Sequence, residues 1–170
     1  QAPKTTTITL KVKKANGSIT NIQDISKEYD GQVVTQPTFN KSGTGNVTIE
    51  YKVKDADDTT YTTTKPKDAG TYKVRVTVGE DGTYEATSGE KEFTITPKKL
   101  NVTVDSVTKE YDGNNSVKLD FNDAHFDGKC GNDQLSVTAD GNFTDVNAGE
   151  NKKVSLSNLV LNGTDKNNYV

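Results

Sequence analysis

The chain has 170 residues, with 21 Lys and Arg against 24 Asp and Glu, one Cys and one His. The net charge of −3 gives no sign of the clustered basic face that a nucleic-acid partner requires, and no stretch approaches the roughly 18 apolar residues of a membrane helix. A zinc site made of several His and Cys ligands and an internal disulfide framework are also excluded. The length allows one domain or two small ones.

Alternation of apolar and polar residues predicts β-strands along the whole chain. In chain order the alternating segments are residues 7–13, 47–53, 71–78, 93–95 and 100–104, and residues 154–159 begin in the same way and then lose phase. Clusters of Gly, Asn, Asp and Ser separate these segments and predict turns. Short strands, frequent turns and the absence of helical periodicity predict an all-β fold of antiparallel sandwich modules.

An internal repeat predicts two modules. The sequence Lys-Glu-Tyr-Asp-Gly at residues 27–31 returns at 109–113, and two further landmarks return in the same order: residues 68–70 as 147–149, and 79–84 as 163–169. Pro97 and the two lysines after it mark the boundary. We expect one module over residues 1–97, in which residues 1–16 are either a leading strand or the end of a preceding module, and a second over residues 98–170.

These landmarks resemble known bacterial modules. The second copy resembles the YDG-type repeat, through residues 111–113, 131–133, 143–149, 153–154, 163 and 168–169. The first copy is similar to the related MBG-type Ig-like modules, through residues 29–31, 65–72 and 93–97. The resemblance implies tandem Ig-like β-sandwich modules in secreted or wall-anchored proteins with an adhesin-like or stalk-like architecture.

The two copies end differently. The first copy continues from Tyr84 through a further strand to Pro97, whereas the second stops one residue after Tyr169. We therefore expect the second module to lack its closing strand, and to be completed by a neighbour or to carry a frayed edge, because an unpaired edge strand can pair with another chain.

The repeated Tyr-Asp-Gly motif has two interpretations. Tyr could stack on a sugar whose hydroxyls Asp accepts, or the motif could be a structural corner in which Tyr fills the edge of the core, Asp caps a turn and Gly takes a positive φ. Because the motif occurs once in each module, the structural interpretation is favoured. Three other tyrosines, Tyr51, Tyr61 and Tyr84, would indicate a binding platform if they lay together on one exposed face.

Other chemistry finds little support. His125 and Cys130 lie five residues apart but lack a recognisable orienting group or oxyanion hole, so we predict an exposed His and an incidental thiol. Acidic clusters at residues 55–58 and 120–133 lack the ligand spacing of a calcium loop and are interpreted as solvated turns. A Lys–Asn or Lys–Asp isopeptide crosslink requires facing strands that one sequence does not reveal. We predict no catalytic, cofactor-binding or metal-binding residues.

Three functions remain open. The first is a non-catalytic spacer of a bacterial cell-surface or secreted multi-module protein, whose partners are the neighbouring modules. The second is adhesion to a host or cell-wall glycan or to an extracellular-matrix protein, through an exposed edge strand or a tyrosine platform. The third is an accessory region of a secreted carbohydrate-active enzyme. No nucleic acid and no membrane insertion of this segment are expected.

Overall fold

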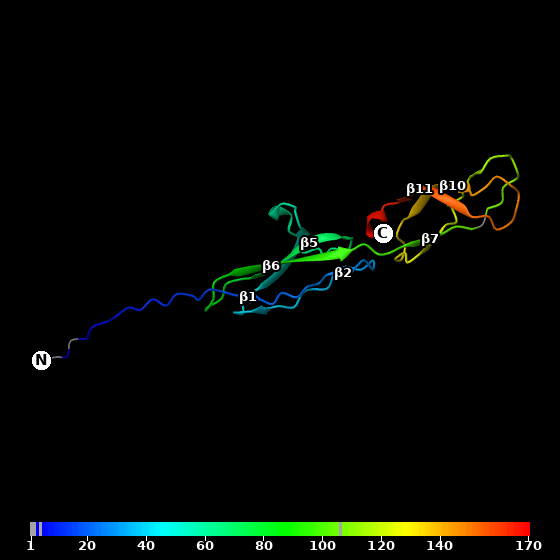
Figure 1. The fold of residues 1–170 in the computed structure, drawn as a ribbon. Coiled ribbons are helices and arrows are strands. Elements are labelled where there is room, and N and C mark those ends of the chain that lie inside the picture. The colour runs from blue at the N-terminus through cyan, green and yellow to red at the C-terminus, as the bar shows by residue number, and fades with distance from the viewer. Residues whose placement is uncertain (1–2, 4, 106) are drawn as a thin grey trace. The chain divides into compact units, whose positions relative to one another are not determined.

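The computed structural model describes residue 3, residues 5–105 and residues 107–170, and within them the fold is all-β, as predicted (Figure 1). Two single-turn 3-10 helices, η1 (Asp58–Thr60) and η2 (Lys166–Asn168), accompany the strands. Among these residues no helix has the length and apolar character needed to cross a membrane.

Eleven strands form four sheets in the described part of the chain. The strands are β1 (Ile19–Thr20), β2 (Lys27–Glu28), β3 (Asn40–Lys41), β4 (Val47–Val53), β5 (Gly70–Val78), β6 (Thr87–Thr96), β7 (Asn101–Thr103), β8 (Ser116–Val117), β9 (His125–Asp127), β10 (Ser136–Phe143) and β11 (Val154–Asn162). The sheet orders are β2-β6-β5-β4, β11-β10-β8, β1-β3 and β7-β9. This set of sheets is consistent with a β-sandwich fold.

The chain divides into two compact units. The first takes the described residues of 1–25 together with 35–66 and 71–93, and the second takes 26–34, 67–70 and 94–170. The Tyr-Asp-Gly motif of the first copy is therefore part of the second unit. The two units are described separately below.

Residues 7–13, predicted to form a strand, lie outside all the sheets. They are extended and fully exposed, and Figure 1 draws them as a trace without an arrow. The first residue of this region in a β-bridge is Ala15, which pairs in parallel with Tyr84. Of the predicted leading segment 1–16, residues 1, 2 and 4 lie outside the described part of the chain.

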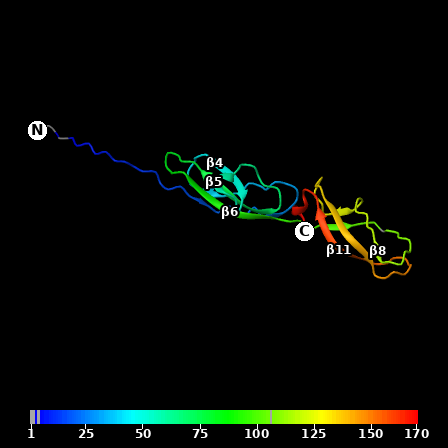
Figure 2. The same cartoon turned by 90° about the horizontal axis from the view of Figure 1, so that it is seen from above.

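The core of the first unit depends on the alternation in β5. Val74, Val76 and Val78 are buried, and β5 pairs antiparallel with β4 along the full length of β4. Figure 2 shows β4, β5 and β6 running side by side. The Phe93 ring of β6 stacks on Tyr72 with 5.6 Å between ring centroids. Apolar side chains from three neighbouring strands thus share one face, as the period of two requires.

The alternation predicted for β4 fails at its end. Lys52 is buried and Val53 is exposed, the reverse of the prediction. The loop after β4 folds back over the strand, where the Lys52 Nζ donates to the Ala56 carbonyl at 2.7 Å and pairs with Asp58 at 2.6 Å. Because its ammonium group has these partners and its stem is apolar, Lys52 can take an inward position.

The second unit is organised by the antiparallel pair β10 and β11. The pairing runs from Ser136 opposite Asn162 to Phe143 opposite Val154, with a register shift between Thr138 and Asp140. Opposite this shift Asn158 has a φ of +51°. A bulge of this kind adds a residue to one strand, which explains why the alternation predicted for residues 154–159 loses phase.

A substitution at the buried end of β6 tests the packing of this fold directly. Ile95 is fully buried, and we expect Ile95→Ala to lower the free energy of unfolding by about 2–5 kcal/mol, because it removes buried methyl groups and leaves a cavity. The matched control is Ile8→Ala in the exposed segment, which should change stability by less than about 0.5 kcal/mol. Urea denaturation followed by circular dichroism measures both, and equal effects would contradict this packing.

Candidate functional site

The Tyr-Asp-Gly motif of the first copy forms a tight corner. The Asp30 carboxylate accepts a hydrogen bond from the Gln32 amide at 2.9 Å and pairs with the Lys27 ammonium at 2.5 Å. The bond from Lys27, followed by that from Gln32, holds the pKa of Asp30 below its usual value. Gly31 has a φ of +74°, a conformation that disfavours residues with a Cβ.

The second copy builds the same corner. The Asp112 carboxylate accepts from the Asn114 amide at 3.0 Å and pairs with Lys109 at 2.8 Å, and Gly113 has a φ of +77°. Lys109 is the main cause of a lowered pKa at Asp112. In both copies the acid and the glycine therefore have the structural roles expected of them, and the carboxylate is directed at its own turn.

The two motif tyrosines differ. Tyr29 is 1% exposed, whereas Tyr111 is 71% exposed. Within the second unit, the hydroxyl groups of Tyr29 and Tyr169 both donate to the Asp133 Oδ2, at 2.7 and 2.5 Å, and the two rings meet edge to face. The expectation that the motif tyrosine fills the edge of the core is thus met in the first copy and not in the second.

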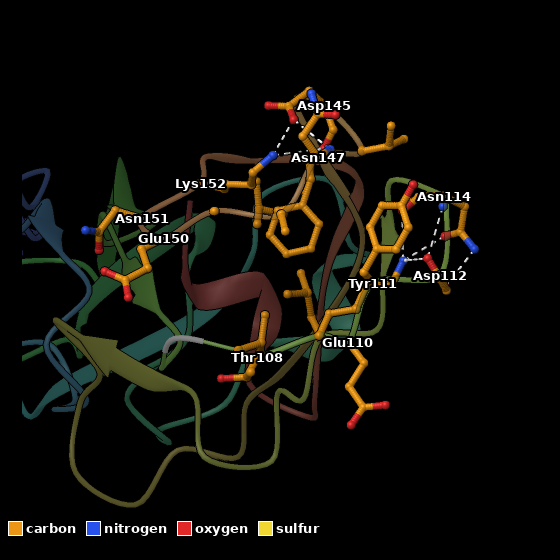
Figure 3. Close-up of a pocket in the computed structure, with 18 of the residues that line it drawn as sticks. Thr108, Glu110, Tyr111, Asp112, Asn114, Asp145, Asn147, Glu150, Asn151 and Lys152 are labelled. Atoms are coloured by element: carbon orange, nitrogen blue, oxygen red, sulfur yellow. Dashed lines mark hydrogen bonds and ion pairs between the residues drawn. The ribbon is translucent and has the colours of Figure 1, made fainter.

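A groove of about 800 Å³ lies beside Tyr111 (Figure 3). Its apolar lining includes Leu119, Phe143, Val154 and Leu156, so that it reaches the end of β10 and the start of β11. All of its lining residues belong to the second unit. The groove is therefore an uncovered part of the apolar face of this sheet.

The rim of the groove carries charge held by local turns. Asp145 accepts from the Asn147 amide at 2.9 Å and forms an ion pair with Lys152, as the dashed lines of Figure 3 show. The bond from Lys152 is the main cause of the lowered pKa of Asp145. Asn147 belongs to the second repeated landmark, so two of the repeated landmarks form parts of one groove.

The aromatic platform considered above is not formed. Tyr51 is buried. The Tyr61 ring lies 3.8 Å from the Arg75 guanidinium carbon, and its hydroxyl donates to Glu90 at 2.9 Å. Because Tyr51 and Tyr61 are engaged inside the first unit, the three tyrosines do not make one exposed face.

His125 and Cys130 are positioned by different contacts. His125 is exposed on β9 and pairs across the sheet with Thr103. The amide of Cys130 donates to the Tyr169 hydroxyl at 2.7 Å, and its thiol lies 3.6 Å from the Lys98 Nζ. The described contacts of this cysteine are structural, and none of them provides the base that a nucleophilic thiol needs.

The acidic clusters serve as turns. Asp57 caps η1 by accepting from the Thr59 amide, Asp58 pairs with Lys52, and Asp120 accepts from the Asn122 amide. Among the described residues no group of three or more His, Cys, Asp and Glu side chains is arranged to hold a metal ion.

What the sequence did not indicate is the groove itself. Its lining comes from residues 104–105, 107–112, 114, 119, 143, 145–152, 154 and 156, which are far apart in the sequence. The one signal available was the difference between the copies after Tyr84 and Tyr169, which predicted an unpaired edge without placing it.

Family comparison identifies both copies. The MBG domain model matches residues 16–97, and the YDG domain model matches residues 96–170. No curated protein and no solved structure gives a significant match to the chain.

The paired tyrosines predict a pH dependence. Burial, followed by the hydrogen bond to Asp133, raises the pKa of both Tyr29 and Tyr169 above the usual value of 10. The folded state therefore keeps these protons where the unfolded chain has begun to lose them, so we expect stability to fall as the pH rises above about 10. The double variant Tyr29→Phe/Tyr169→Phe should flatten this decline in urea titrations at pH 9 to 11. A decline as steep as in the wild type, with Tyr111→Phe as the control for an exposed hydroxyl, would contradict the assignment.

Proposed function

We propose, from the presence in this chain of an MBG domain followed by a YDG domain, that it is a spacer region of a secreted or cell-surface bacterial protein. In this role the modules hold another part of the protein at a distance and have neighbouring modules as their partners. The family matches support a modular, non-catalytic region, and the more specific role is the proposal.

The observation that carries the proposal is the duplicated corner. Both copies use the same Lys, Asp and Gly positions to close one turn, through the Lys27–Asp30 and Lys109–Asp112 ion pairs. The charged groups of this motif bond to one another and to the backbone of their own turn. They therefore stabilise each module, and few of their hydrogen-bonding positions remain for a ligand. Repetition of such a motif is what a series of similar stacked units requires.

Parallel contacts within each copy support the same role. Ala15 bridges in parallel to Tyr84, and Lys98 bridges in parallel to Tyr169. Each bridge joins an early residue of a copy to its late tyrosine landmark. The two copies thus share this contact as well as the corner, which is what a series of similar units requires.

Adhesion is the second candidate, and Tyr111 is the observation in its favour. Its ring is exposed beside an apolar groove with polar and acidic groups at the rim. Sugars stack on exposed aromatic rings, and carboxylates accept hydrogen bonds from their hydroxyls, so a glycan could be held here.

A binding assay against a panel of glycans and extracellular-matrix proteins distinguishes the spacer function from adhesion. For a spacer we expect no saturable binding at high protein concentration while circular dichroism shows an intact β fold. A saturable ligand that is lost on Tyr111→Ala, but kept on Val53→Ala at another exposed position, would overturn the spacer and identify the groove as an adhesion site.

A further inference from the structure

The groove lies beside β11, a strand that no further strand of the described residues covers on its outer side. In the four-stranded sheet, β6 lies between β2 and β5. In the second copy, residues 109–110 correspond to β2, and β11 corresponds to β5 because each follows the repeated Ala-Gly landmark. No strand of the described residues lies between them, and β11 is the edge of the order β11-β10-β8.

The open position exposes apolar side chains. On β11, Leu156, Leu159 and Val160 are 49%, 61% and 48% exposed. Leu156 lines the groove and lies opposite Gly141 in the pairing of β11 with β10. An uncovered edge strand with apolar side chains accepts another strand readily, since both backbone pairing and apolar burial are gained.

The chain also carries an extended segment that belongs to no sheet. In residues 5–13, which we name the arm, Ile8, Leu10 and Val12 are 86%, 82% and 84% exposed and alternate with Thr and Lys. The arm has nine residues, the same length as β11. It therefore presents one apolar edge in the extended form that pairing with β11 needs.

The arm repeats the spacing of the apolar residues at the end of β6. Ile8 and Leu10 stand 85 residues before Phe93 and Ile95, and Lys13-Lys14 stand 85 residues before Lys98-Lys99. Phe93 and Ile95 are the buried residues of β6. The arm thus has the apolar spacing that fills this position in the four-stranded sheet.

Charge favours the same pairing. The lining of the groove carries a net charge of −3, because two of its five acids, Asp112 and Asp145, are paired with its two lysines; the other three acids are Asp105, Glu110 and Glu150. The arm carries Lys11 and Lys13 and no acid. A basic strand entering an acidic groove gains attraction at its rim, and this attraction weakens as salt is added.

We propose that the arm of one copy adds as a strand to the outer edge of β11 in a second copy and covers the groove. Tyr111 and Leu156 are then enclosed. The contact is head to tail, because the arm and the groove are different surfaces of one chain, so it extends into a series of copies or closes a ring. This inference does not depend on the spacer function.

Sedimentation velocity of the full chain from micromolar to millimolar concentration tests the proposal. We expect dimers and higher species whose proportion falls with added salt. Ile8→Lys/Leu10→Lys should weaken association by at least about tenfold, since two apolar side chains are no longer buried. The matched control Thr7→Lys/Thr9→Lys adds the same charge on the polar side of the arm and should associate with much smaller loss.

The groove is tested in the same way. Leu156→Arg, which puts a long cation into the groove, should abolish association, whereas Val53→Arg on the exposed edge of β4 should not. A mixture of Ile8→Lys/Leu10→Lys with Leu156→Arg should form dimers only, because it contains one working groove and one working arm. Formation of these dimers would also show that both variants are folded, because each of them contributes one intact surface.

Three outcomes would overturn the proposal. The wild type could remain monomeric throughout the concentration range. If its arm were then protected from hydrogen exchange, the arm would be bound to its own copy. Association could survive both the arm and the groove variants, which would place the contact elsewhere. The mixture of the two variants could fail to form dimers although circular dichroism shows each of them to be folded.

Discussion

Insertion of β6 between β2 and β5 is the constraint on which the rest of the four-stranded sheet depends. Phe93 and Ile95 of this strand are buried, and the Phe93 ring stacks on Tyr72 of β5. The insertion also gives the short strand β2 a partner, through Lys27 opposite Ile95. A two-residue strand has little stability of its own, so the corner that follows β2 is held in place by this pairing.

The contrast between the two copies shows what this strand contributes. Both copies form the turn of the Tyr-Asp-Gly motif, which needs only bonds between neighbours in sequence. Only the tyrosine that follows β2 is buried, and its hydroxyl reaches Asp133, 104 residues away. The local conformation is thus encoded within five residues, whereas the buried Tyr29 side chain contacts Asp133 and Tyr169, which lie far away in the sequence.

The same division separates what could be predicted from what could not. Strand β5 and the glycine turns follow from patterns within a few residues. The buried Lys52 was not predictable, because its position depends on a loop that returns to give it Asp58. The groove was not predictable either, since its lining is collected from distant segments. An alternating pattern shows which face of a strand is apolar, but it does not show which other strand packs against that face.

The parallel pairing of β2 with β6 has a mechanical consequence. It joins an early segment of the copy to a late one, through Lys27 opposite Ile95 and the Tyr29 amide bonded to the Thr96 carbonyl. When a chain is stretched from both ends, two parallel strands of this kind are pulled past each other along their length. Their hydrogen bonds then carry the load together and break as a group, whereas a hairpin pulled open at one end loses its bonds one at a time. Resistance to tension along the chain is thus built into the order of the strands.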